Sequence, residues 1–326
     1  MPSELAVSWR VRLMDRWRQR LARLLPAAPP LMLLAALAMI EPRVLSAGNL
    51  VNIAQQASYL AVFASAQMIV LLVRGFDLSL GACVSAVSVL SALVLTGTSA
   101  GFGSWSGITA GLALAGCIGA FNAVCITQLR VGPFVATIGS LNVCMGIATT
   151  ISDGRPVFGV PPAFSRLLYS GSIGGVPAAV AIAAAVAVMM HLVLRGTVFG
   201  RSLVLVGSNP RAAIAAGLSV GWTTAFAYVA CSLLAGLGAL MLTARTGSGE
   251  PNLGGNLALE SIAAAVVGGV SLRGGTGSVP QAISGAVFIT VLSNGMNLVR
   301  IGGYVQMIVL GCVIIAALLL ERSHRR

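Results

Sequence analysis

The segment from residue 51 to residue 73 reads VNIAQQASYLAVFASAQMIVLLV and contains no charged side chain. A helix rises 1.5 Å per residue, so a segment of this length covers about 35 Å, slightly more than the hydrocarbon core of a bilayer. Lipid offers no hydrogen bonds to backbone groups, so the segment has to satisfy them internally. We therefore predict that residues 51–73 form a helix that crosses a membrane.

The rest of the chain repeats this pattern. Apolar residues make up 57 % of the 326 residues and charged residues only 9 %, whereas about a quarter of an ordinary soluble domain is charged. Ten apolar stretches approach or reach spanning length: 25–41, 51–73, 77–97, 106–127, 133–152, 173–194, 222–243, 257–272, 279–298 and 303–320. The predicted fold is therefore all-α, a polytopic integral membrane protein with about ten transmembrane helices.

The positions of arginine predict the orientation of these helices, because the chain has no lysine. With a cytoplasmic N-terminus, fifteen of the twenty arginines lie on the cytoplasmic side, as the positive-inside rule expects. The five outside are Arg43, Arg155, Arg166, Arg245 and Arg300. Ten spans then return the C-terminus to the cytoplasm. The net charge of +12 thus reflects topology, and no nucleic-acid partner is expected.

Two short segments flank the predicted transmembrane domain at residues 25–320. Residues 1–24 place six arginines around an apolar stripe that includes Trp9, Leu13 and Trp17. This pattern predicts a basic amphipathic helix lying on anionic lipid at the cytoplasmic face, and a disordered basic tail is the alternative. No convincing cleavage site follows, so we expect the segment to stay uncleaved. Residues 321–326 are expected to form a cytoplasmic tail.

The chain is poorly supplied with residues for enzyme chemistry. It has only two histidines, His191 and His324, and its six cysteines show no metal-binding spacing. The glycine-rich turn at 274–278 lacks the lysine that a phosphate-binding P-loop requires. We therefore expect no catalytic site, metal or cofactor on this chain, and we expect any ATP to be hydrolysed by a partner.

A short helix is predicted inside the longest cytoplasmic connection, residues 195–221. Asn209 can cap its start, Pro210 suits the first helical position, and Gly217 can end it. The apolar side chains of this helix are small, so the helix suits insertion into a groove on another protein, and lying on lipid is the alternative. The segment contains Gly207, Ser208, Asn209, Pro210, Arg211, Ala212, Ala213, Ile214 and Gly217.

Several motifs follow one another in an order that is specific to a known family. They are GFDLSLG at 75–81, PFVAT at 133–137, GR at 200–201, GSN at 207–209, SIAAAVVGGVSLRGGTG at 261–277, NGMNL at 294–298 and YVQMIV at 304–309. With these motifs the chain resembles the membrane permease subunits of ribose-type (monosaccharide) ATP-binding-cassette (ABC) importers. The resemblance extends from residue 48 to the C-terminus.

The resemblance implies partners and a location. Residues 207–217 would be a coupling helix seated in a cytoplasmic ATPase subunit, which would bind ATP and Mg²⁺. A second permease subunit, identical or paralogous, and an extracytoplasmic sugar-binding protein would complete the importer in the bacterial cytoplasmic (inner) membrane. Family members usually have Glu-Leu-Asp where this chain has Ala258-Leu259-Glu260. The alternative, an ion-coupled secondary transporter, would normally place ionisable groups near mid-membrane, whereas Glu260 lies near the outer end of its predicted span.

A neutral, hydroxyl-rich solute needs amides and hydroxyls along its route, and such groups are costly against lipid. The candidates are Asn52, Gln55, Gln56, Gln67, Asn122, Asn142, Asn294 and Asn297, which together would line a pathway, although each could instead bridge two helices. Glu260 is predicted to act at the outer gate, and the alternative is a charge tolerated at a helix start.

A turn that contains Gly75, Asp77 and Ser79 precedes the third predicted span. Asp77 is predicted to be a helix N-cap whose carboxylate accepts backbone N–H bonds, with Arg74 as a possible ion-pair partner. Direct contact of Asp77 with sugar is the alternative.

Overall fold

The computed structural model describes residues 25–97 and 103–323 of the chain. Each of the ten predicted spans contains a helix: α2 (Ala28–Ile40), α3 (Ala47–Leu72), α4 (Leu80–Gly97), α5 (Gly103–Thr127), α6 (Pro133–Ile151), α8 (Ala178–Gly196), α11 (Val220–Thr246), α12 (Leu257–Val267), α13 (Val279–Leu298) and α14 (Gly303–Ser323). Seven of the described helices, all but α2, α12 and α14 among these ten, are long and apolar enough to cross a membrane. The predicted helical membrane fold is confirmed.

Helix α12 is shorter than its predicted span. It has 11 residues and ends at Val267, so it covers about 17 Å, roughly half of the hydrocarbon core. The chain leaves the helix at Gly268 and Gly269, where Gly269 has a φ of +98°. The prediction that residues 257–272 form one helix is therefore wrong, because a glycine pair allows a backbone turn that apolar composition does not indicate.

The connections contain structure that the sequence pattern did not indicate. Residues Val198–Ser208 form the helix α9, directly before the short helix α10 (Pro210–Ala215). Two pairs of short antiparallel strands are also present: β1 (Val157–Phe158) with β4 (Ser248–Gly249), and β2 (Ser172–Ile173) with β3 (Val176–Pro177). The remaining short elements are η1 (Leu25–Ala27), η2 (Pro42–Leu45), α7 (Pro162–Ser165) and the π-helical η3 (Arg166–Ser170).

The start of α8 also differs from its prediction. The predicted span begins at residue 173, but residues 172–177 form the β2–β3 hairpin, with Gly174 and Gly175 at positive φ in its turn. Helix α8 therefore begins only at Ala178. At the other end of the chain, α14 continues to Ser323, three residues beyond its predicted end. The predictions for residues 1–24 and 324–326 lie outside the described residues.

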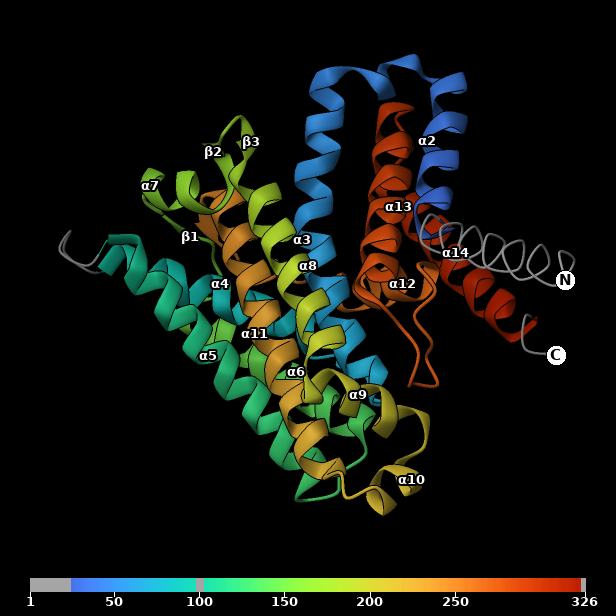
Figure 1. Ribbon diagram of the computed structural model, residues 1–326. Helices are drawn as coiled ribbons and strands as arrows, with labels where there is room; N and C mark the ends of the chain where they lie inside the picture. The colour runs from blue at the N-terminus through green and yellow to red at the C-terminus, as the bar shows by residue number, and fades with distance from the viewer. Residues whose placement is uncertain (1–24, 98–102, 324–326) are drawn as a thin grey trace, which may run out of the picture.

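Helix α3 occupies the centre of the bundle. It packs against α11, α13, α12 and α8, and every residue from Leu60 to Leu72 is buried. Figure 1 shows α3 between α11 and α13. The approach to α11 is close, because a Cβ atom on Gly238 would lie 2.3 Å from the Phe63 ring. A helix that is apolar around its whole circumference needs such a central position.

Helices α5, α6 and α8 form the outside of the bundle and are mostly exposed. Their exposed side chains include large apolar residues such as Phe121, Val143 and Leu192. In a membrane these faces contact lipid or another subunit. Figure 1 places α9 and α10 at one end of the molecule, and the connection between α2 and α3 at the opposite end, together with the hairpin β2–β3.

Candidate functional site

Helix α10 has the capping groups that its sequence predicts. The Asn209 side-chain oxygen accepts hydrogen bonds from the backbone nitrogens of Arg211 and Ala212, both at 3.1 Å. Pro210 occupies the first turn, and Gly217 has a φ of +79° just beyond the helix. The short helix thus begins at Pro210, as its sequence predicts, whereas Gly207 and Ser208 belong to the end of the preceding helix α9.

The outward face of α10 differs from the predicted one. Ala212 and Ala215 are exposed, and Ile214 retains 63 % of its accessible surface. Ala213 is only 3 % exposed, because it lies on the side of α10 that packs toward α9 and α11. The prediction that Ala213 belongs to the docking surface is therefore wrong. Its methyl group helps to seat α10 on the rest of the chain.

Three backbone segments meet next to α10: Leu72 and Arg74, Gly207 and Ser208, and Gly275. We call this contact the cytoplasmic junction, after the side of the membrane on which the arginine distribution predicts it. Arg74 donates from Nε to the Gly207 carbonyl at 2.5 Å and from Nη2 to the Ser208 carbonyl at 2.7 Å. The Gly275 nitrogen donates to the Leu72 carbonyl at 2.9 Å. The predicted ion pair between Arg74 and Asp77 is therefore absent, because the guanidinium is directed toward α9.

Asp77 lies three residues before the first residue of α4 and is 1 % exposed. Its Oδ1 atom accepts hydrogen bonds from the Ser79 nitrogen at 2.9 Å and from the Ser79 hydroxyl at 2.5 Å. Its Oδ2 atom accepts a longer bond from the Cys231 thiol at 3.7 Å. The carboxylate thus holds the turn that precedes Leu80, but Asp77 is not the N-cap residue itself, because the first helical bond runs from the Cys83 nitrogen to the Ser79 carbonyl. The burial of Asp77 separates it from solute in this conformation.

The neighbours of Asp77 join three helices. The Asn122 amide of α5 donates to the Ser79 hydroxyl at 2.9 Å, while the Asn122 side-chain oxygen has no partner among the described residues. Tyr228 of α11 donates to the Phe76 carbonyl at 3.1 Å. A Cβ atom on Gly75 would lie 2.4 Å from this tyrosine hydroxyl, so the turn needs glycine there.

The predicted pathway amides do not form one cluster. On the exposed part of α3, Gln56 donates to Asn52 at 2.9 Å, and Gln55 is half-buried nearby on the same helix. Gln67 is fully buried, and neither of its polar atoms has a partner in the described structure. Asn142 is exposed on α6 and donates to the backbone of its own helix at 3.0 Å.

Two amide pairs involve residues that the sequence analysis missed. Asn294 of α13 and Asn49 of α3 exchange reciprocal hydrogen bonds of 2.9 and 3.0 Å. Asn297 accepts a bond from Gln306 of α14 at 2.8 Å. Asn49 lies two residues before the predicted span, so a search for amides beside span boundaries would have found it. Gln306 lies within one of the family motifs.

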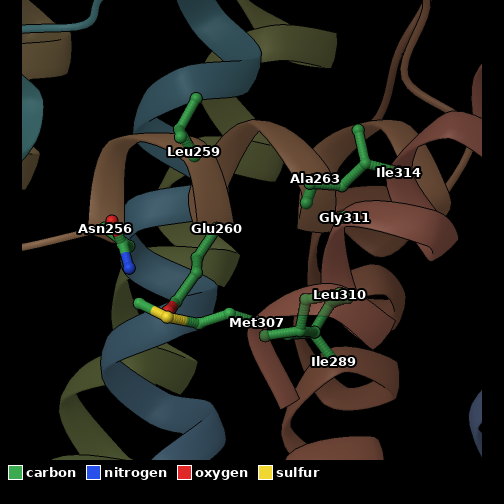
Figure 2. A pocket seen from close by; sticks show the side chains of 9 residues that line it. All are labelled: Asn256, Leu259, Glu260, Ala263, Ile289, Met307, Leu310, Gly311 and Ile314. Atoms are coloured by element: carbon green, nitrogen blue, oxygen red, sulfur yellow. The ribbon is translucent and has the colours of Figure 1, made fainter. Parts of the chain in front are cut away.

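Glu260 is half-buried in the first turn of α12, where the sequence predicts it. It lines a cavity of ≈ 220 Å³ between α12, α13 and α14. Figure 2 shows its side chain extending toward Met307, with mostly apolar side chains around it. The lining residues are Asn256, Leu259, Glu260, Ala263, Ile289, Met307, Leu310, Gly311 and Ile314. The carboxylate accepts no hydrogen bond from the described residues.

The described residues contain no group of three or more His, Cys, Asp or Glu side chains that could hold a metal ion. The features that remain are a capped helix at one end of a helical membrane bundle, and scattered amides and one carboxylate within it.

Comparison with known proteins decides the class of protein. Residues 49–318 match the family described as branched-chain amino acid transport system / permease component. The chain belongs to this family. It is therefore a multi-pass permease subunit of a transport system and not an enzyme. No solved structure matches the chain.

Individual relatives agree with this assignment. The probable ABC transporter permease protein y4mJ of Sinorhizobium fredii is 34 % identical, over 98 % of this chain and 94 % of that protein. The ribose import permease protein RbsC of Bacillus subtilis is 30 % identical, over 89 % of this chain and 90 % of that protein. The D-allose transport system permease protein AlsC of Escherichia coli is 29 % identical, over 85 % of this chain and 84 % of that protein. The ABC permease prediction is thereby confirmed over the ion-coupled alternative.

Proposed function

We propose that this chain is the membrane-spanning subunit of an ABC importer for a monosaccharide or a similar small polyhydroxylated solute. The similarity to permeases named for ribose and D-allose supports the solute class. In the proposed importer, a separate cytoplasmic ATPase binds ATP and Mg²⁺, an extracytoplasmic binding protein delivers the solute, and a second permease subunit completes the pathway in the bacterial cytoplasmic membrane.

The observation that carries the ATPase partnership is the geometry of α10. This helix is capped by its own Asn209, exposes small apolar side chains such as Ala212 and Ala215, and is held at the cytoplasmic junction. A short amphipathic helix of this kind suits a groove on a partner protein. The chain itself has no lysine for a P-loop, so the ATP has to bind elsewhere.

Four amides that are exposed or half-buried are the best candidates for contact with solute. Asn52, Gln55 and Gln56 lie on the exposed part of α3, and Asn297 is exposed at the end of α13. These groups can exchange hydrogen bonds with hydroxyls without the cost of burying a charge. Asn122 and Asn294 instead connect helices within the chain, which is the alternative role that their sequence left open.

Glu260 is proposed to act at the outer gate, where its unpaired carboxylate can accept a hydrogen bond from a solute hydroxyl or help to receive the binding protein. Glu260→Gln should lower the uptake rate severalfold, and Glu260→Ala should lower it further, because Gln keeps size and part of the hydrogen bonding. Uptake of labelled solute by cells expressing equal protein levels measures this. Unchanged uptake and unchanged binding-protein-stimulated ATPase activity in both variants would mean that Glu260 is only a charge at a helix start.

The proposed function is tested by uptake of labelled D-ribose and D-allose in a strain that lacks the native transporter. The strain expresses this chain with the ATPase and binding protein that we expect to be encoded beside its gene, and the control omits this chain. We expect uptake of at least one sugar that requires ATP and persists when a protonophore collapses the proton gradient. Uptake that stops with the protonophore while ATP remains high would contradict the proposal.

A further inference from the structure

The cytoplasmic junction brings together parts of the chain that lie far apart in sequence. It joins the end of α3 at Leu72, the end of α9 at Gly207 and Ser208, and the turn after α12 at Gly275. A Cβ atom on Gly207 would lie 1.6 Å from the Leu72 carbonyl oxygen, and one on Gly275 would lie 2.3 Å from the Ser208 hydroxyl. The three backbones are therefore in direct contact, with no space for side chains between them.

Arg74 is the side chain that connects two of these segments. Its guanidinium bonds the Gly207 and Ser208 carbonyls, which belong to the last turn of α9. Carbonyls at a helix C-terminus lack partners within the helix and carry partial negative charge, so a cation is favourable there. The planar fork of arginine binds two such acceptors at once, which the compact ammonium of lysine does not.

The backbone of Arg74 is also unusual. Its φ is +63°, in the left-handed region that non-glycine residues rarely occupy. This conformation directs the side chain from the end of α3 toward α9 while the main chain turns toward α4. A strained backbone at this position persists because the surrounding contacts hold it.

The junction lies directly before α10. Asn209, which follows the Arg74-bound carbonyl of Ser208, caps α10 with its side chain. No flexible linker therefore separates α10 from the junction. On the other side, α3 leads from the junction into the buried centre of the bundle, and its opposite half carries Asn52, Gln55 and Gln56.

We propose that Arg74 is a positioning residue that couples movement of α10 to movement of α3. This inference rests on the proposed function, because it assumes that a partner ATPase moves α10. A displacement of α10 pulls on the Gly207 and Ser208 carbonyls, and the guanidinium passes that displacement to α3. Without the guanidinium, α9 and α10 move on the bundle surface while α3 stays in place.

The test compares Arg74→Asn with Arg130→Asn. Asparagine tolerates a positive φ, so Arg74→Asn removes the guanidinium with little added backbone strain. Arg130 is a matched control, because it has a φ of +56°, is exposed, and forms no side-chain hydrogen bond with the described residues. Each variant is reconstituted in proteoliposomes with the ATPase and binding protein, and uptake and ATP hydrolysis are measured together.

For Arg74→Asn we expect hydrolysis within about twofold of the wild-type rate and at least a tenfold loss of sugar taken up per ATP hydrolysed. Arg130→Asn should leave both unchanged. A second variant, Arg74→Lys, serves if Arg74→Asn does not fold. It keeps the charge but not the planar guanidinium, and the sugar taken up per ATP hydrolysed should fall between the wild-type value and the value expected for Arg74→Asn. An unchanged ratio in the Arg74 variants, or an equal fall of uptake and hydrolysis, overturns the coupling role.

Hydrogen exchange on the purified chain gives a readout that does not need the partners. Loss of the guanidinium should speed amide exchange in residues 205–216 severalfold, and Arg130→Asn should not. Unchanged exchange in this segment would also overturn the inference. If the wild-type complex shows no ATP-driven uptake at all, the proposed function fails. If the wild-type complex works and the Arg74 variants take up as much sugar per ATP hydrolysed as the wild type does, only the coupling role is refuted.

Discussion

At the residue scale, Asp77 shows how a buried carboxylate determines where a helix begins. Residues 77–79 carry no helix, although the apolar pattern extends through them, because the Asp77 side chain bonds the Ser79 nitrogen and hydroxyl. These bonds hold the backbone in a turn that helix geometry would not allow. The first regular turn of α4 therefore starts at Leu80.

Asp77→Asn should be close to wild type in stability, because the amide oxygen can accept the same two bonds. Asp77→Ala should lower the free energy of unfolding by about 0.5–2 kcal/mol, because the capping acceptor is lost. Thermal unfolding of the purified protein in detergent measures both. Equal destabilisation by Asn and Ala would show that the negative charge, rather than the acceptor geometry, is what the site requires.

Gly207 gives a second test at this scale. Gly207→Ala should lower the free energy of unfolding by about 1–3 kcal/mol, because the added methyl group overlaps the Leu72 carbonyl and has to push α9 away from α3. Gly221→Ala is the control, since nothing lies within 4 Å of its added Cβ, and it should be neutral or slightly stabilising. Similar stability of the two variants in denaturant unfolding would contradict the close packing of the junction.

At the element scale, α10 has one face that holds it in place and another that is free. Ala213 is buried against the chain, whereas Ala212 is exposed. These neighbouring residues have the same side chain, so substitutions at the two positions separate docking from folding.

Ala212→Glu should leave the permease folded and reduce ATPase co-purification and uptake, because a long charged side chain cannot enter a groove shaped for a methyl group. Ala213→Glu should instead lower the free energy of unfolding by about 1–3 kcal/mol, because it places a carboxylate without partners inside the chain. Thermal unfolding and co-purification, measured on both variants, distinguish these outcomes. Normal uptake and normal co-purification with Ala212→Glu would exclude this face as the docking surface.

At the same scale, the short length of α12 determines how deep its two ends lie in the membrane. Because it covers only about half of the hydrocarbon thickness, its two ends lie at different depths from those of its neighbours. Its first turn carries Glu260 beside the cavity, and the turn that follows it reaches Gly275 at the junction. A short helix thus connects the proposed outer gate with the coupling end of the molecule.

At the scale of the whole molecule, the arginine distribution predicts which end faces the cytoplasm. A cysteine at Arg166 should react with a membrane-impermeant maleimide in intact cells, whereas one at Arg211 should react only after the membrane is opened. Both residues are exposed. The background carries serine at the exposed cysteines Cys117 and Cys312. Labelling of Arg211→Cys in intact cells would reverse the predicted orientation.

The sequence by itself determined the class of fold, the approximate position of each long helix and the caps of α10. These features depend on local properties: the length of an uncharged stretch decides whether it spans lipid, and Asn209, Pro210 and Gly217 act on residues within a few positions of themselves. The order of the motifs along the chain also indicated the permease family.

Only the tertiary structure decided the features that depend on distant partners. Arg74 binds carbonyls that lie 133 and 134 positions away, and it does not form the ion pair that its closeness to Asp77 in the sequence suggested. Asn294 pairs with Asn49 across 245 positions. Ala213 is buried because α10 rests on α9 and α11, and α12 ends early because a glycine pair allows the chain to turn toward α3. The physical reason is that tertiary contacts, whether they are made by side chains or by backbone, leave no periodic or compositional signal in the sequence.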